Sequence, residues 1–320
     1  MKPFISNLFP GRGPLYAALL GSCVIACGGT YSNEDIAFQS AVPASESLQP
    51  NVGAQLVEGS AEYYRLTHGV VTSYRKILGF VAVILGEVRR VPATTRAPGQ
   101  RIWGPFADEE DPRFVHRVVM RKLPAGTDAT TAPDERFTYS IETAPGGTPA
   151  VSDAWAQVVT GWFDPARGVS QGRGQVIFDV DSLRTRRYRL GADVETLRVI
   201  TLDYDIEADA RTLIVHQENL ASASSRSADL AYRETADGAA TTHFTVTGTG
   251  AAAVEAFDVV SAWRADGAGR ADVLVSRGGA LGLSATDCWD GLTQPTYVRR
   301  DWDVGKNTGD PATCVLPALR

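Results

Sequence analysis

The segment LRVITLDYDI, residues 197–206, carries the pattern that decides the fold. Its apolar and polar side chains alternate, with Ile200, Leu202, Tyr204 and Ile206 in one register and Thr201, Asp203 and Asp205 in the other. Successive side chains of a strand point to opposite faces, so this segment predicts a strand with one buried face and one wet face.

The same period of two extends on both sides of this segment. Within 174–180, Val176, Phe178 and Val180 share one face and Asp179 takes the other. Turn signals such as Pro145-Gly146-Gly147 and Asp237-Gly238 separate the apolar runs. The predicted strands are 114–121, 136–143, 154–163, 174–180, 197–206, 212–218, 229–234, 241–247, 254–264 and 271–276. We therefore predict a mainly β (α+β) fold, in which residues 114–283 form an antiparallel meander of about ten strands that curves into a half-barrel or barrel.

Residues 51–91 have the spacing of a helix instead, with apolar residues three and four positions apart between Tyr63 and Val88. Asn51 is the expected N-cap and Pro92 follows the end. Glycines at 59, 69, 79 and 86 argue against one unbroken rod. The stretch 77–85 is apolar all round but too short to span a bilayer, so we expect the sheet to enclose it.

The segments on either side of the predicted sheet have no regular pattern. We expect 92–113 to be a connector, with the acidic run Asp108 to Asp111 as a solvated loop, and 284–320 to be irregular.

Composition limits the function classes. The 320 residues include 31 basic and 37 acidic ones, for a net charge of −6. A nucleic-acid binder needs a basic surplus to displace counterions from phosphates, so we expect no nucleic-acid partner.

The N-terminus has the pattern of an export signal. Lys2 and Arg12 precede an apolar run of 12 residues, LYAALLGSCVIA, that ends in Val24-Ile25-Ala26-Cys27. This ending resembles the lipobox of bacterial lipoproteins, in which the cysteine thiol takes a diacylglyceryl group. Leu20-Gly21-Ser22-Cys23 also fits; we favour Cys27, which leaves the longer apolar run. An ordinary cleaved signal peptide with two incidental cysteines is the alternative.

The resemblance implies a processing and localisation scheme. Residues 1–26 would be removed, lipid on Cys27 would hold the protein at a membrane, and 27–50, which is polar and contains proline, would be a flexible tether. Gly28 rather than aspartate after the cysteine implies the outer membrane, facing the periplasm. In that oxidising compartment Cys288 and Cys314 should form a disulfide that staples the C-terminal segment.

One motif suggests catalysis. Gly168-Val169-Ser170-Gln171-Gly172 matches the G-x-S-x-G elbow of serine hydrolases, which needs a strand before the serine and a helix after it. Here Asp164-Pro165 precedes the motif and the predicted strand 174–180 follows it. We interpret the motif as a hairpin loop, and a hydrolase stays only as a third alternative.

The sequence does not predict a metal site or a cofactor. His68, His116, His216 and His243 have no HxH or HExxH spacing. Calcium would need convergent oxygens, and the available acids are Asp179, Asp181, Asp203, Asp205 and Glu207. We expect those acids to form a solvated face balanced by Arg184, Arg186, Arg187, Arg189 and Arg198.

Two function classes remain for a non-catalytic envelope lipoprotein. It could bind a lipid or another hydrophobic ligand, because a curved sheet around an apolar helix is similar to the periplasmic lipoprotein-carrier fold; this resemblance is architectural and covers about residues 51–280. Alternatively, its core is filled and its surface contacts envelope proteins. The chain also resembles uncharacterised envelope lipoproteins of Gram-negative bacteria, which implies no activity. A cavity of several hundred cubic ångströms between helix and sheet would favour ligand binding.

Overall fold

The structure is a computed structural model. It describes residues 32–51, 53–108, 111–123, 136–150, 152–165, 171–188, 195–220, 227–249 and 254–319. Within these residues the chain forms fifteen strands and six helical segments.

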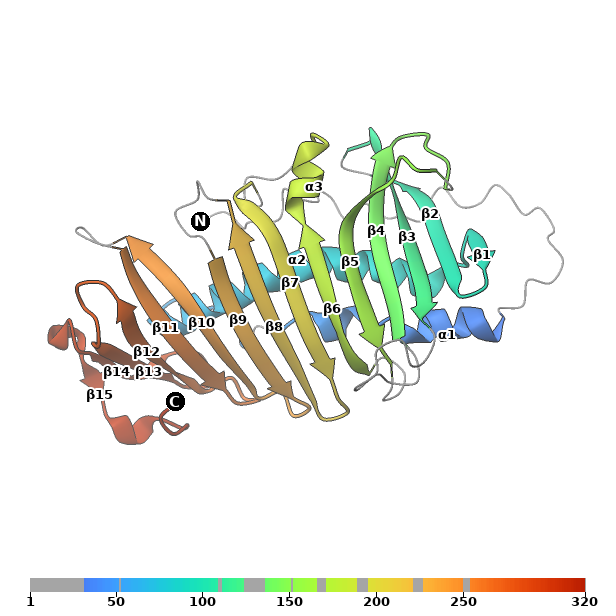
Figure 1. Ribbon diagram of the computed structural model, residues 1–320. Coiled ribbons are helices and arrows are strands. Elements are labelled where there is room, and N and C mark those ends of the chain that lie inside the picture. The colour runs from blue at the N-terminus through green and yellow to red at the C-terminus, as the bar shows by residue number, and fades with distance from the viewer. Residues whose placement is uncertain are drawn as a thin grey trace.

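Fifteen strands form one antiparallel sheet in which each strand pairs with its neighbours in sequence (Figure 1). The strands are β1 Thr95–Ala97, β2 Gln100–Ala107, β3 Phe114–Leu123, β4 Arg136–Pro145, β5 Ala156–Asp164, β6 Gly172–Asp179, β7 Leu197–Ile206, β8 Ala210–Asn219, β9 Ser227–Thr235, β10 Ala240–Thr249, β11 Val254–Trp263, β12 Gly269–Arg277, β13 Ser284–Trp289, β14 Pro295–Arg300 and β15 Thr308–Gly309. The helical elements are α1 Asn33–Ala41, η1 Ser45–Leu48, α2 Glu62–Arg90, α3 Val180–Thr185, η2 Val304–Lys306 and η3 Pro311–Thr313.

The ten predicted strands are confirmed as β3 to β12, and β7 has the predicted bounds. The strand count was too low, because β1 and β2 lie in the expected connector and β13 to β15 lie in the segment expected to be irregular. Among the described strands, β1 and β15 each pair with one neighbour only, so the sheet is open and the closed barrel is wrong.

The alternation of apolar and polar residues predicted for β7 matches the alternation of buried and less buried side chains along the strand. Ile200, Leu202 and Ile206 lie in the core, whereas Asp203 is exposed. On the neighbouring strand, β6 ends at Asp179, whose side chain accepts a hydrogen bond from the backbone N–H of Ser182 and caps α3. The predicted strand 174–180 therefore ends one residue early, because Asp179 begins a helix instead of continuing the ladder.

Helix α2 crosses one face of the sheet at a steep angle to the strands (Figure 1). Its N-terminus meets β13, where the N–H of Tyr63 donates to Asp287, and just past its end the indole of Trp103 on β2 donates to the carbonyl of Val91. A helix of 29 residues is about 43 Å long, whereas the eleven inter-strand spacings from β2 to β13 cover about 53 Å. The sheet therefore twists and bends across the helix.

Two predictions about this helix were wrong. It begins at Glu62 and not after Asn51, because its N-terminal amide is capped from a distant strand by the carboxylate of Asp287. It is also unbroken through Gly69, Gly79 and Gly86. Packing of one apolar stripe along the sheet outweighs the cost of about 1 kcal/mol for each glycine.

The flexible tether predicted for 27–50 is also contradicted from residue 32 onward. Helix α1 and η1 occupy this stretch, and Phe38, Val42 and Leu48 are fully buried in the core. Phe38 packs edge-on against Phe137 of β4, with ring centroids 5.1 Å apart. The segment is polar in composition, but these three apolar side chains are buried. Their burial stabilises the ordered conformation of the segment.

A buried ion-pair cluster attaches α1 to the sheet. Arg101 of β2 is 3% exposed and donates to Asp35 at 2.5 Å and to Glu34 at 2.8 Å. Burial by itself raises the pKa of Asp35, but the hydrogen bonds from Arg101 and Ser32 outweigh it and lower this pKa to about 2. The carboxylate therefore stays charged and paired across the physiological range.

The predicted disulfide is present between Cys288 of β13 and Cys314, with Cα atoms 5.3 Å apart. It attaches the segment after β15 to the buried strand β13. The C-terminal region is consequently an ordered extension of the sheet rather than an irregular tail.

Candidate functional site

An open groove runs beside the N-terminal half of α2. Its larger hollow has a volume of about 470 Å³ and lies between α2 and strands β8 to β10. The lining residues are Arg65, Leu66, Gly69, Val70, Ser73, Tyr74, Gln217, Ala228, Asp229, Phe244, Thr245 and Val246. Apolar side chains dominate this lining, so the hollow suits a hydrocarbon group.

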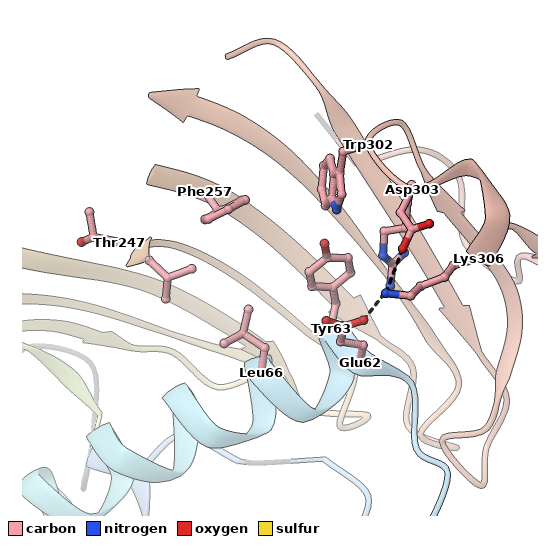
Figure 2. Close-up of a pocket in the computed structure, with 10 residues that line it drawn as sticks. Glu62, Tyr63, Leu66, Thr247, Phe257, Trp302, Asp303 and Lys306 are labelled. Atoms are coloured by element: carbon pink, nitrogen blue, oxygen red, sulfur yellow. Dashed lines mark hydrogen bonds and ion pairs between the residues drawn. The ribbon is translucent and has the colours of Figure 1, made fainter. Parts of the chain in front are cut away.

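A second hollow of about 350 Å³ continues toward the C-terminal strands. Leu66 and Val246 line both hollows, which are therefore adjoining parts of one groove. In Figure 2, Trp302 and Phe257 face Tyr63 and Leu66 of α2 across this space. The rings of Phe257 and Trp302 contact each other edge-on at 6.3 Å.

The second hollow carries two ion pairs, and we call it the charged end of the groove. Lys306 pairs with Asp303 at 2.8 Å, and Arg300 pairs with Glu62 at 3.5 Å. Figure 2 shows Glu62, Asp303 and Lys306 grouped on one side of the hollow. The charged end thus presents both signs of charge beside an aromatic wall.

Arg300 is the fixed member of this group. It is 5% exposed, bonds the fully buried Asp287 at 2.6 Å, and stacks its guanidinium 4.4 Å over the ring of Tyr63. Burial raises the pKa of the Tyr63 phenol to about 12, so this side chain stays neutral. Hydrogen bonding to Asp303 raises the pKa of Lys306, which keeps its ammonium charged.

Sequence reasoning did not find this groove. It identified Leu66, Val70 and Tyr74 as helix positions but treated them as core, and it gave no role to Arg300, Asp303 or Lys306. The available signal was the aromatic Trp302 among charged residues, a combination common at ligand surfaces. Nothing in the sequence shows that β10, β11 and the C-terminal segment meet at α2.

The predicted lipidation residues, Cys27 and its alternative Cys23, lie outside the described residues, as does Ser170. The strands around the G-x-S-x-G motif are described, however. β5 and β6 pair antiparallel, with Asp164 opposite Arg173, so the motif connects two strands of a hairpin. A nucleophile elbow needs a helix after the serine, and β6 takes that place.

The four histidines do not come together. His68 lies on α2, and the other three occupy strands as predicted: His116 on β3, His216 on β8 and His243 on β10. His216 pairs with Asp229 at the surface. No group of potential metal ligands occurs among the described residues.

The acidic run 108–111 is not a solvated loop at the two ends that the structure describes. Asp108 and Asp111 are buried, and Asp108 accepts hydrogen bonds from His116 and Tyr188, both at 2.5 Å. Burial alone raises the pKa of Asp108, but these bonds and the N–H of Asp111 lower it to about 2. This buried cluster connects β3 with the segment after α3, and we interpret its role as structural.

The acids considered for calcium do not converge either. Asp179 caps α3, Asp181 pairs with Arg184 within that helix, and Asp203 accepts from Gln175 on the exposed face of the sheet. These three carboxylates have separate local partners, and Asp181 pairs with Arg184, an arginine of the predicted balancing set.

Comparisons with protein-family models, with curated proteins and with solved structures find no match to this chain. None of the helices in the described ranges combines the length and apolarity that crossing a bilayer requires.

Proposed function

We propose that the protein is a membrane-anchored envelope lipoprotein, held by lipid on Cys27, that binds a hydrophobic ligand in the groove beside α2. It acts as a binding or carrier module and not as an enzyme. The outer membrane facing the periplasm is the proposed location.

The observation that carries the proposal is the groove itself. Hollows of about 470 and 350 Å³ fall within the range of small-molecule sites. Leu66, Val70 and Val246 are half-buried along this groove, and covering their exposed apolar surface would stabilise the protein by about 25 cal/mol per Å². An apolar ligand supplies that cover.

The glycines of α2 offer a direct test. Gly69 lines the groove, and a Cβ added there would meet nothing within 4 Å. Gly69→Trp should therefore fill the groove without disturbing the fold and reduce ligand binding at least tenfold. Gly86→Trp is the matched control, because Gly86 lies on the same helix, also faces open space, and is not among the residues that line the groove.

Native mass spectrometry of the purified full-length protein gives the readout. We expect a co-purified lipid with the parent and with Gly86→Trp, and its loss with Gly69→Trp. Equal occupancy of the two variants, or a parent without any bound hydrophobic molecule, would remove the support for a binding module.

The alternative is an interaction lipoprotein with a filled core. It is favoured by the tight packing of Tyr64, Val71, Leu78 and Leu85, all of which are buried against the sheet. On this alternative the groove would contact an envelope protein, and cross-linking from position 69 would capture a protein instead of lipid.

The anchor has its own test. Radiolabelled palmitate should enter the parent protein and be lost in a Cys27→Ser variant. Loss only when Cys23→Ser is introduced would move the anchor to Cys23, and labelling that survives both changes would exclude lipidation at this motif.

A further inference from the structure

We propose that the ligand is a membrane phospholipid with a zwitterionic headgroup, whose acyl chain lies along α2 and whose headgroup sits at the charged end of the groove. This inference rests on the proposed function, since it names the ligand class of the same site.

The length of the groove fits one acyl chain. The part of its lining on α2 that forms the apolar hollow runs from Arg65 to Tyr74, which is about 14 Å of helix. Half of the hydrocarbon core of a bilayer, the depth reached by the chains of one leaflet, is about 15 Å. The apolar lining by Leu66, Val70 and Val246 therefore covers most of the length of one acyl chain.

The charges of the groove determine the headgroup class. The charged end has two cations, Arg300 and Lys306, and two anions, Glu62 and Asp303. An anionic headgroup would gain from the cations but would face both carboxylates. A zwitterionic headgroup places its phosphate by Lys306 and its amine by Glu62 and Asp303, so that each charge meets its opposite.

The exposure of these side chains agrees with such an exchange. Lys306 is 72% exposed, Glu62 64% and Asp303 40%, so the Lys306–Asp303 pair and the 3.5 Å pair of Glu62 with Arg300 are weak and easily replaced by a ligand. Arg300 differs, because it is 5% exposed and tied to the buried Asp287. Arg300 therefore keeps its position beside Asp287, and the exposed side chains of Lys306, Glu62 and Asp303 contact the headgroup.

The rings around the charged end suit an ammonium group. Phe257 and Trp302 line the same hollow as the two carboxylates, and aromatic faces attract cations. Trp302 is partly exposed and contacts Phe257, which leaves the indole beside the opening.

The test uses two lysophospholipids that share one 16-carbon chain and differ only in the headgroup, together with the free 16-carbon fatty acid. Lysophosphatidylethanolamine, lysophosphatidylglycerol and the free fatty acid compete at equal concentration for the purified full-length protein, and native mass spectrometry measures the bound fraction of each. We expect the ethanolamine lipid to be preferred about fivefold over the glycerol lipid, which corresponds to about 1 kcal/mol.

The variant Glu62→Gln/Asp303→Asn removes both carboxylates and leaves the cations. It should abolish or reverse this preference, while the total amount of bound lipid stays near that of the parent. Glu218→Gln is the control, because Glu218 belongs to a comparably exposed ion pair with Arg198 and does not line the groove.

The outcomes separate the two proposals. If lipids bind without headgroup preference, or the anionic ones win, and Gly69→Trp still blocks binding, the headgroup inference fails and the proposed function stands. An unchanged preference in Glu62→Gln/Asp303→Asn also overturns the inference. If none of the three lipids binds the parent, both proposals fail.

Discussion

The strands from β3 to β7 and the groove beside α2 differ in how closely they are packed. In the half from β3 to β7, aromatic rings lie directly on strand glycines: the stacked pair Tyr139 and Phe163 has centroids 4.5 Å apart, and Tyr139 covers Gly161. The ring of Trp289 covers Gly269 of β12 in the same way, so close packing on strand glycines extends into the half from β8 to β14. In that half, Gly69 of α2 contrasts with these strand glycines because it faces open space beside the groove.

The comparison suggests that different parts of the molecule stabilise the fold and border the groove. The half from β3 to β7 also holds α1 through the contact of Phe38 with Phe137, and the adjoining strand β2 adds the Arg101–Asp35 pair. The grooved half is held instead by an ion pair and a disulfide at its end. Substitutions in the two halves should therefore have different consequences.

The largest effect is expected at the end of the grooved half. Arg300→Met leaves the carboxylate of Asp287 buried without its cation, which should cost about 3–5 kcal/mol in the free energy of unfolding. Urea denaturation measures this loss. Adding Asp287→Asn should recover most of the lost free energy of unfolding, because the buried charge is then removed. If the double variant is no more stable than Arg300→Met, the loss does not come from the unpaired carboxylate of Asp287.

Removal of the disulfide should come next. Cys288→Ser/Cys314→Ser frees a loop with a sequence separation of 26 and should lower stability by about 3 kcal/mol. Thermal unfolding of the parent under reducing conditions should match the double variant. If the reductant leaves the melting temperature of the parent unchanged, this result would argue against a disulfide between Cys288 and Cys314.

In the half from β3 to β7, Gly161→Ala should destabilise by about 2 kcal/mol. The added Cβ would lie 2.2 Å from the carbonyl oxygen of Gln175 and 2.3 Å from the ring of Tyr139, so the strand or the ring must move. Chemical denaturation is the measurement. Parent-like stability would mean that this half is looser than its geometry indicates.

The Asp108 cluster should make stability depend on pH. The pKa of Asp108 is lowered from 3.8 to about 2, so the unfolded chain binds the proton more readily. The resulting stability, about 2 kcal/mol, is present above pH 4 and is lost as the pH falls toward 2. Melting temperatures between pH 5 and pH 2.5 should decline less steeply in Asp108→Asn than in the parent.

The smallest effect is expected at Gly69. Gly69→Ala should raise stability by about 0.5–1 kcal/mol, since alanine favours the helix and its Cβ meets nothing within 4 Å. The opposite signs expected for Gly69→Ala and Gly161→Ala contrast the groove with the closely packed strands directly. A loss of stability at both positions would contradict the prediction that Gly69 borders open space while Gly161 is closely packed.

The sequence predicted the strands well because their side chains record burial locally. A period of two, interrupted by turn residues, identified all ten strands from β3 to β12. It missed β1, β2 and β13 to β15, which lack a clean alternation, and it placed the start of α2 eleven residues early. The cap of that helix is Asp287, more than two hundred residues away, and no local pattern could indicate it.

The candidate site was harder to predict than the fold. The sequence by itself determined the antiparallel order of the strands, the amphipathic helix and the pairing of the two C-terminal cysteines, because each depends on residues close together or on a small set of choices. Only the tertiary structure decided that the sheet stays open and that Leu66, Phe257 and Lys306 border one groove. Those facts depend on how far the sheet bends across α2, and that bend is set by the summed twist and packing of many strands rather than by any one segment.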